Sequence, residues 1–296
     1  MFNFGGLTEG DLKGRGARYS VIPVPYDLTA TYGSGARRGP NAIIEASTHM
    51  ELYDTELERE PYRAGIETLE PLEPTAAGPE GMIKAVRTAV ASVIEANKIP
   101  VLLGGEHSIT LGAVRAALER WPDLTVLQLD AHADMRESYQ DTPFSHASVA
   151  RRISEICPIV QAGIRSMSAE EAEFLKEDAG CEGGRVTTYY AAAMTGAYGV
   201  KKTSEGAIKN LSGNVYLTVD VDVFDPSIMP STGTPEPGGL GWYEILRLLE
   251  KVVTEKSVRG FDVVELSPLP GVVAPDFLAA RLVYKIMAYI NEGLKA

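Results

Sequence analysis

Short runs of apolar and β-branched residues alternate with longer amphipathic segments along most of the 296-residue chain. Apolar residues at every third or fourth position predict a helix, whereas a short β-rich run bounded by turn residues predicts a strand. The predicted strands cover residues 19–24, 99–103, 124–129, 159–163, 186–190, 215–219 and 260–264, and the clearest predicted helices cover 79–96, 241–253 and 276–290. Because this alternation runs from end to end, we predict an α/β fold with a mostly parallel central sheet and helices on both of its faces.

The segment 70–81 is rich in proline and glycine and is the best candidate for a linker between domains. The composition does not change after it, and the rhythm of strands and helices continues. We therefore interpret it as a surface loop and predict a single domain over residues 1–296, although one domain per ~150 residues would suggest two. No internal repeat of the length found in solenoid proteins is visible.

The composition, 45% hydrophobic and 23% charged residues, is that of a globular protein with a large core. No stretch approaches the ~18 apolar residues of a membrane helix, and the first residues lack the pattern of a signal peptide. We therefore expect a cytoplasmic protein that does not contact a membrane. A formal charge of −12 disfavours nucleic acid as a partner. The spacing of Cys157 and Cys181 predicts neither a disulfide framework nor a zinc–thiolate site.

Three of the predicted strands are followed by motifs of the same chemical character. Residues 104–108 read GGEHS, residues 130–134 read DAHAD, and residues 220–226 read DVDVFDP. In open α/β sheets, ligands bind beyond the carboxyl ends of the strands. The position of these motifs therefore indicates a site that is built from several strand ends.

The acidic residues of these motifs predict a metal centre. Side chains alternate faces in an extended backbone, so Asp130, His132 and Asp134 can point the same way, as can Asp220 and Asp222. Buried carboxylates need a counter-charge, and Arg136 is the only basic residue near them in the sequence. Carboxylates mixed with imidazoles suit manganese and similar ions, and this number of carboxylates favours two bridged ions that activate a shared water.

Each motif alone also has an ordinary structural interpretation. A histidine after two glycines, such as His107, is more often a loop residue than a ligand, and a single Asp-x-Asp is usually a solvated turn. Three such motifs at three strand ends are much harder to explain as turns. Their combination therefore favours a functional site over three unrelated loops.

The same residues resemble the signatures of the arginase/agmatinase ureohydrolase family. The similarity covers GGEHS at 104–108, DAHAD at 130–134, SHAS at 145–148, DVDVFDPSIMPSTGTPEPGGL at 220–240, VVELSP at 263–268 and the amino-terminal segment 23–43. The resemblance implies a three-layer α/β/α sandwich with two manganese ions at the strand ends. It implies that His107 and Asp134 hold one ion, that His132 and Asp222 hold the other, and that Asp130 and Asp220 bridge both.

The reaction implied by the resemblance is hydrolysis of a guanidinium group to urea and an amine by a hydroxide that bridges the metals. Glu265 matches the glutamate that binds the guanidinium, and a carboxylate can pair with this planar cation through two hydrogen bonds. His146 matches the histidine that transfers a proton to the leaving amine, and Asp134 is expected to take the proton of the hydroxide. We interpret Glu106 and Asp225 as residues that orient ligands or cap a loop.

The residues after DAHAD favour agmatine, the decarboxylated form of arginine, as the substrate. Arginases bind the α-amino and α-carboxylate groups with an asparagine-bearing loop, and residues 135–145 contain no asparagine. We expect Glu137 and Asp141 to suit a small dication, which hydrolysis would convert into putrescine and urea in polyamine biosynthesis. Aminopropylagmatine, which also lacks the carboxylate, is an alternative substrate. Because Arg136 could bind a carboxylate, carboxylated substrates remain alternatives as well, namely guanidinobutyrate, formiminoglutamate and arginine.

Two further classes of function remain as alternatives. A dinuclear phosphoesterase would use similar ligands but would also offer cations for phosphate, and the motifs provide acids instead. A catalytically silent metal-binding subunit finds no support, because every expected ligand is present. The resemblance also implies a homo-trimer or homo-hexamer. The pairs Arg37–Arg38 and Arg151–Arg152 are expected on solvated faces or subunit contacts, and His49 is expected to be an ordinary exposed side chain.

Overall fold

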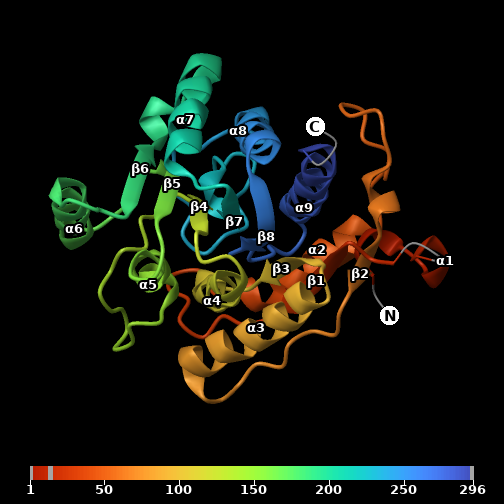
Figure 1. Ribbon diagram of the computed structural model, residues 1–296. Helices are drawn as coiled ribbons and strands as arrows, with labels where there is room; N and C mark the ends of the chain where they lie inside the picture. The colour runs from red at the N-terminus through yellow and green to blue at the C-terminus, as the bar shows by residue number, and fades with distance from the viewer. Residues whose placement is uncertain (1–2, 13–15, 294–296) are drawn as a thin grey trace.

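The computed structural model of the protein describes residues 3–12 and 16–293. All strands in these ranges pair in parallel in one eight-stranded sheet with the order β2-β1-β3-β8-β7-β4-β5-β6 (Figure 1). The strands are β1 Tyr19–Val24, β2 Ile66–Thr68, β3 Ile99–Gly104, β4 Thr125–Leu129, β5 Ile159–Ile164, β6 Val186–Tyr190, β7 Asn214–Asp220 and β8 Ser257–Val264. The seven predicted strands are confirmed, and the sheet is wholly rather than mostly parallel.

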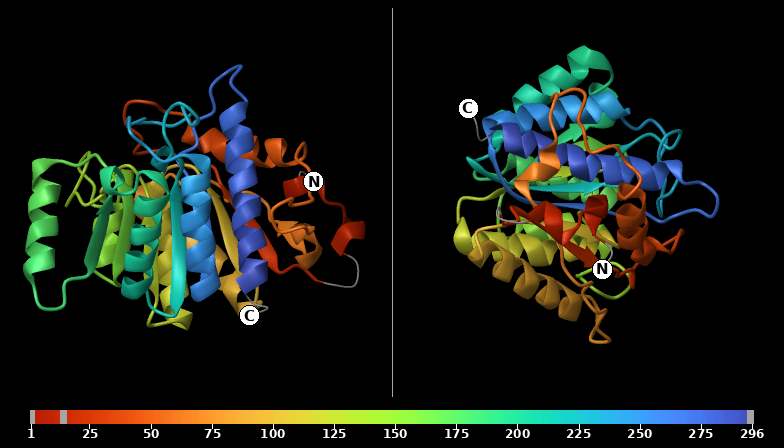
Figure 2. Two further views of the ribbon diagram at one scale, coloured as in Figure 1. Left: turned by 90° about the horizontal axis from the view of Figure 1, so that it is seen from above. Right: turned by 90° about the vertical axis from the view of Figure 1, so that its right-hand side faces the viewer.

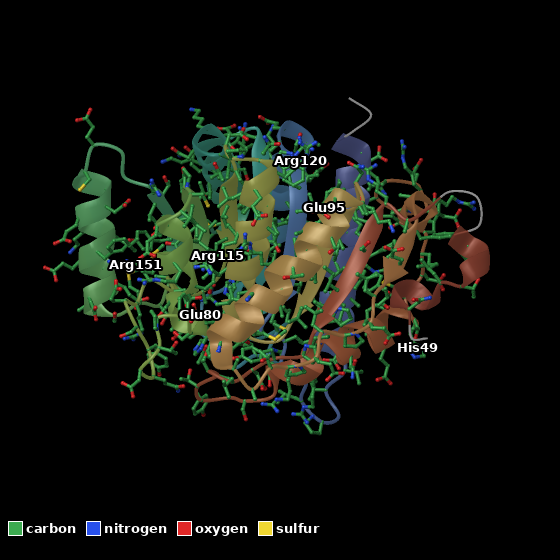
Figure 3. All side chains as sticks on the ribbon, turned by 60° about the horizontal axis from the view of Figure 1, so that its bottom comes forward. His49, Glu80, Glu95, Arg115, Arg120 and Arg151 are labelled. Atoms are coloured by element: carbon green, nitrogen blue, oxygen red, sulfur yellow. The ribbon has the colours of Figure 1, made fainter. Side chains whose placement is uncertain are left out.

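Helices cover both faces of the sheet and complete the predicted three-layer α/β/α sandwich. They are α1 Glu9–Leu12, α2 Gly39–Ser47, α3 Gly78–Glu95, α4 Thr110–Arg120, α5 Val149–Ser154, α6 Ala169–Gly180, α7 Gly196–Asn210, α8 Trp242–Glu255 and α9 Ala274–Gly293. Buried residues of α2, α7, α8 and α9 pack in one apolar cluster, and those of α3, α4, α5 and α6 pack in another. Figure 2 shows α7, α8 and α9 side by side over the sheet, and Figure 3 shows α3 and α4 together on the opposite face.

The alternation of side chains along the strands explains the two apolar clusters. Val21 and Val101 belong to the cluster of α2 and α9, whereas Ile22 and Leu102 belong to the cluster of α3 and α4. Strands that are buried on both faces are mostly apolar, as the apolar runs in the sequence indicated. The loops at the carboxyl ends of the strands lie outside these apolar clusters and can carry polar residues.

Two local features differ from the sequence prediction. The three-residue strand β2 was not predicted, because a run this short has no measurable periodicity and forms only through its pairing with β1. The predicted loop 70–81 ends earlier than expected, since α3 begins at Gly78. His49 is exposed, as predicted. None of the helices in the described ranges is long and apolar enough to cross a membrane.

Candidate active site

Four neighbouring strands bring the predicted site residues to one edge of the sheet. β3 leads into the 3₁₀ turn His107–Ile109, and β4 is followed by residues 130–134. β7 ends at Asp220 and continues into the 3₁₀ turn Val221–Val223, and Glu265 directly follows β8. These strands are adjacent in the order β3-β8-β7-β4, so their carboxyl ends meet, as expected for a ligand site in a parallel sheet.

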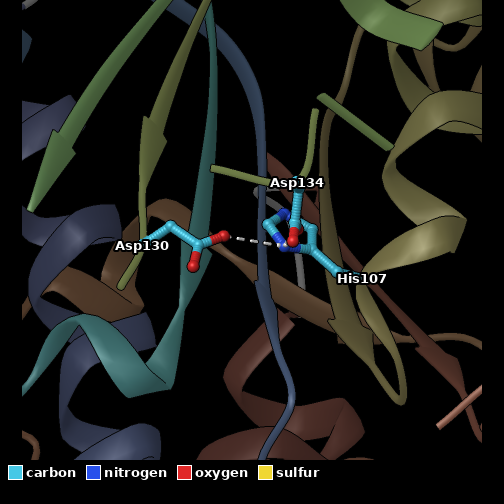
Figure 4. Close-up of side chains that lie close together, drawn as sticks. All are labelled: His107, Asp130 and Asp134. Atoms are coloured by element: carbon cyan, nitrogen blue, oxygen red, sulfur yellow. Dashed lines mark ion pairs between the residues drawn. The ribbon is translucent and has the colours of Figure 1, made fainter. Parts of the chain in front are cut away.

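His107 faces three carboxylates from two other loops. Its Nδ1 lies 3.1 Å from Oδ2 of Asp130, 3.3 Å from Oδ2 of Asp134 and 3.4 Å from Oδ2 of Asp220. Figure 4 shows Asp130 and Asp134 turned toward the imidazole ring. All four side chains are buried. The sequence-predicted ligands of the first metal therefore converge on a single point.

A second group lies beside the first and shares Asp130 with it. Nδ1 of His132 is 2.9 Å from Oδ2 of Asp222 and 3.7 Å from Oδ1 of Asp130. Ligand atoms of these three residues lie within 4.8 Å of one another, as do those of His107, Asp130 and Asp134. The two groups share Asp130, whereas Asp220 stands with His107 in the first group, and the assignment of each residue to a particular ion stays a prediction.

The hydrogen bonds of His107 leave one ring nitrogen available for a cation. Nε2 lies 2.8 Å from Oγ1 of Thr218, whose hydroxyl donates to the buried carboxylate of Asp262. Thr218 therefore accepts the Nε2–H of the histidine, which leaves the Nδ1 lone pair directed at the carboxylates. Nδ1 is buried and makes no hydrogen bond to any described residue. An unpartnered imidazole nitrogen among carboxylate oxygens fits a divalent cation.

The electrostatics of the cluster also fit a bound cation. Burial raises the pKa of Asp134 to about 7, with Asp130 adding to the effect, and burial raises the pKa of Asp130 and Asp220 as well. Burial opposes ionisation of Asp222 too, but His132 outweighs it and lowers the pKa of that carboxyl. Carboxylates that are difficult to ionise together need positive charge between them. The cluster is thus arranged for ions rather than for structural salt bridges.

Main-chain and side-chain donors fix the orientation of the aspartates. Nε2 of Gln128 donates to Oδ2 of Asp130 over 2.8 Å, and the N–H of His132 donates to Oδ1 over 2.6 Å. The N–H of Asp222 donates to Oδ1 of Asp220 over 2.9 Å. Asp134 holds a positive φ of 53°, a conformation that is costly outside glycine. The fold therefore maintains this arrangement at some cost, which is typical of functional sites.

Glu265 stands at the edge of the cluster and is also strained. Its φ is 65°, its N–H donates to the carbonyl of Gly105, and its Oε1 accepts the N–H of His107 over 2.6 Å. Burial, together with repulsion from Glu106, raises the pKa of this carboxyl to about 8. A cationic group next to Glu265 would favour its charged form. This is the property expected of a residue that receives a guanidinium.

His146 lies in the 3₁₀ turn His146–Ser148 and is positioned by the amino-terminal loop. Nδ1 is 3.1 Å from Oγ1 of Thr29, and Nε2 is 3.4 Å from Oγ1 of Thr31. The ring meets Tyr139 edge to face, with centroids 5.8 Å apart. Burial lowers the pKa of His146 to about 4. The imidazole is therefore neutral at pH 7 and able to accept a proton.

A cavity of about 140 Å³ connects these groups. It is lined by Asp134, His146 and Glu265, with Tyr139, Thr234 and the side chain of Arg136 nearby on its wall. The guanidinium of Arg136 packs over the ring of Tyr139 at 5.3 Å, and its Nε is 3.9 Å from the carboxylate of Glu171. The cavity thus joins the metal cluster, the proposed guanidinium acceptor and the proposed proton donor in one space.

The structure does not support the predicted role of the loop acids. Neither Glu137 nor Asp141 lines the cavity. The carboxylate of Glu137 lies 3.1 Å from Arg151 and 3.0 Å from Arg152. These two arginines of α5 hold it outside the cavity. Of the two places expected for Arg151 and Arg152, a solvated face does not fit, and a subunit contact stays a prediction. Arg151 stacks on Phe174, and the side chain of Arg152 is only 12% exposed.

Three charged residues hold the loops around the site in place. Glu106 accepts from the N–H and hydroxyl of Thr29, which links the amino-terminal loop to the site. Asp225 accepts the N–H groups of Gly238 and Gly239 and closes the 220–240 segment. Arg165 donates to the carbonyl of Asp222 over 2.6 Å and holds the adjacent metal-site loop. These interactions confirm the interpretation of Glu106 and Asp225 as loop-ordering residues.

Glu236 was missed by the sequence reasoning. Its Oε1 lies 3.9 Å from Nε2 of His132 and accepts the hydroxyl of Ser166 over 2.9 Å. It belongs to the TGTPEPGG segment, whose family resemblance was the available signal. Thr218 and Asp262 were missed because each stands inside a strand that otherwise appears wholly apolar.

Comparisons with known proteins agree with this geometry. The model of the Arginase family matches residues 17–289. The chain is 39% identical to an N(1)-aminopropylagmatine ureohydrolase of Synechocystis sp. over 92% of this chain and 89% of the relative. It is 35% identical to an agmatinase of Pyrococcus horikoshii over 88% and 87% of the two chains. The crystal structure of the agmatine ureohydrolase of Thermoplasma volcanium superposes with a TM-score of 0.86 and 32% identity, covering 100% of this chain and 96% of the other.

Proposed function

Because the chain belongs to the arginase family of ureohydrolases, which cleave amidino carbon–nitrogen bonds, we propose that it hydrolyses N(1)-aminopropylagmatine to urea and spermidine. The choice of substrate rests on the similarity to two N(1)-aminopropylagmatine ureohydrolases. The chain is 39% identical to the Synechocystis protein and 37% identical to the Thermus thermophilus protein. Agmatine, the substrate expected from the sequence, is the second candidate, since the agmatinase of Pyrococcus horikoshii is 35% identical. The two substrates carry the same guanidinium and differ only at the far amine.

Glu265 is the proposed receptor for the guanidinium. Its Oε1 is held by the N–H of His107, so the second oxygen and the negative charge remain for the substrate. A planar guanidinium pairs with a carboxylate through short, charge-assisted hydrogen bonds. Holding the cation in this way fixes its carbon close to the metal cluster, which removes most of the entropic cost of the encounter.

The metal cluster is proposed to hold two manganese ions. His107 and Asp134 would hold one ion, His132 and Asp222 the other, and Asp130 and Asp220 would bridge them. When bound, such a pair lowers the pKa of a shared water toward neutrality and so provides the nucleophile. The mixture of carboxylates and imidazoles, without thiolate, is the support for manganese over zinc.

Two residues are proposed to move the protons of the reaction. Addition of water to the guanidinium carbon forms a carbon–oxygen bond, and the proton of the water passes to Asp134. The carbon–nitrogen bond to the alkyl amine then breaks, and His146 delivers a proton to the departing nitrogen. Because His146 is neutral at pH 7, it can receive the proton that Asp134 took from the water and pass it to the departing nitrogen. The carbon then loses its hydroxyl proton to the released amine as the carbonyl of urea forms.

The wall of the cavity favours a substrate with an amine rather than a carboxylate at its far end. Arg136 is the only basic side chain that lines the described part of the cavity apart from the histidines. Its charge is engaged by the ring of Tyr139 and by Glu171, which reduces its attraction for a substrate carboxylate. This weighs against arginine and guanidinobutyrate, the carboxylated substrates that Arg136 left open.

The proposal is tested by comparing initial rates of urea release by the manganese-loaded enzyme. N(1)-aminopropylagmatine, agmatine, arginine and guanidinobutyrate are supplied separately, and kcat/KM is determined for each. We expect N(1)-aminopropylagmatine to exceed agmatine by about tenfold and both carboxylated compounds to be inert. Equal or faster turnover of agmatine would identify agmatine as the substrate instead. Turnover of arginine alone would contradict the argument from Arg136.

A further inference from the structure

A cavity of about 400 Å³ lies at the edge of the sheet opposite the active site. Its walls come from the first residues of β3 and β8, the residue before β1, and the carboxyl ends of α4 and α9. Strands of six to eight residues separate it from the candidate active site, a distance of about 20 Å at the usual rise per residue. It therefore belongs to neither the metal cluster nor the substrate cavity.

The charge of this cavity is opposite to that of the protein. Five basic side chains line it, namely Arg18, Lys98, Arg120, Lys256 and Arg259, and no carboxylate lines it among residues 3–12 and 16–293. The chain as a whole carries 40 acidic and 28 basic residues. Two acids outside the lining, Glu67 and Asp123, are held by Lys98 and by the amide of Asn214.

Two of these five cations have no hydrogen-bond or ion-pair partner within the part of the chain that the structure describes. The side chains of Arg18 and Arg120 make no hydrogen bond or ion pair there, and Arg18 only packs over the ring of Tyr19. Arg259 is held over Trp121 at 5.1 Å and donates to Oδ1 of Asn214. Burial lowers the pKa of Arg259, and Arg120 lowers it further while Asp123 opposes both. Cations that repel one another in a partly buried space are stabilised by an added anion.

The ends of the surrounding helices explain only part of this charge. Helix carboxyl termini carry partial negative charge, and cations there are favourable. Lys256 fills this role by donating to the carbonyl of Leu211 over 2.7 Å, and Arg120 stands in the last turn of α4. The guanidinium groups of Arg18 and Arg259 belong to strand ends, where no helix dipole requires them.

We propose that this cavity is a binding site for a small anion with two or more phosphate groups. Arginine forks bind phosphate oxygens in pairs, and the lysines provide point charges between them. The volume is within the range of ligand pockets and exceeds what a single phosphate needs. Inorganic polyphosphates and nucleoside polyphosphates share this chemistry, and the indole of Trp121 offers an apolar surface that only the latter would use.

Calorimetric titration of the full-length, manganese-loaded protein tests the proposal at about 0.15 M salt. The probes are pyrophosphate, triphosphate and ATP, with orthophosphate for comparison. The variants are Arg18→Ser and Arg120→Ser, which lose no hydrogen bond, and the matched control is Arg247→Ser, an exposed arginine on α8 outside the cavity. Melting curves establish that all three variants are folded.

We expect saturable binding of pyrophosphate or triphosphate to the wild type, weakened about tenfold or more in each cavity variant and unchanged in the control. Tighter binding of ATP than of triphosphate would show that the site recognises a nucleoside polyphosphate. Equal binding would show that it recognises only the phosphate chain. The proposal is overturned if none of the probes binds below about 1 mM. It is also overturned if binding is the same in all variants, because contact with the manganese ions or nonspecific attraction would then explain it.

Discussion

Replacement of Glu265 by glutamine separates the binding of the guanidinium from the binding of the metals. In the protein, Oε1 of Glu265 accepts the N–H of His107 over 2.6 Å, and the second oxygen and the charge are left for the substrate. Glutamine keeps the shape and the hydrogen bond to His107. However, it removes the charge and places an NH₂ donor where the N–H groups of the guanidinium arrive.

The expected loss follows from these contacts. A hydrogen bond to a charged group contributes about 1.5–3 kcal/mol. In the variant, the amide NH₂ also faces the N–H groups of the guanidinium, so we take the loss of transition-state stabilisation as about 3 kcal/mol. At 1.36 kcal/mol per decade this corresponds to a reduction in kcat/KM of about 10²-fold. Because Glu265 is not among the proposed ligands, manganese affinity should stay within about threefold of the wild-type value.

The assay is urea release under kcat/KM conditions, with manganese binding measured by calorimetry on the same preparations. Glu137→Gln is a matched control, because it also neutralises a carboxylate of the strand-end loops but lies outside the cavity. Retention of more than half of the wild-type kcat/KM in Glu265→Gln would refute the assignment. A parallel loss of manganese would refute the separation of the two roles.

Three further predictions follow from the same geometry. Asp130→Asn removes the carboxylate shared by both ligand groups, so metal analysis should find one manganese ion or none per chain, compared with the two expected for the wild type. His146→Asn should lower kcat by about 10²–10⁴-fold while manganese affinity is unchanged, and an equal loss of metal would contradict a role in proton transfer. Burial raises the pKa of the Cys157 thiol to about 12, so it stays protonated at pH 8, and a thiol reagent should modify the exposed Cys181 but reach Cys157 only after unfolding.

The sequence was sufficient to predict the strands and the residues at their ends. The run LTVLQL at 124–129, mostly apolar and bounded by turn residues, predicts a strand buried on both faces, and the polar residues that follow it are expected at the sheet edge. For this reason Asp130 and Asp220 could be expected to approach each other before any distance was known. The three-residue strand β2 forms only through its pairing with β1, and no local sequence pattern predicts it.

The orientation of side chains in the loops could not be predicted in the same way. Glu137 stands three residues after Asp134, and its sequence position suggests a place near the substrate. Its direction is decided by Arg151 and Arg152, which only the packing of α5 brings within reach. Likewise, the tautomer of His107 depends on Thr218, which lies on a different strand 111 residues away.

The central claim is that two metal ions held by this cluster are required for hydrolysis of a guanidinium group. It is tested most directly by titrating metal-depleted protein with manganese while urea release from N(1)-aminopropylagmatine and from agmatine is followed. We predict no urea without metal and a rate that reaches its maximum at two manganese ions per chain. Full activity at one ion per chain would contradict the dinuclear account, and urea release from the metal-depleted protein would contradict the requirement for metal.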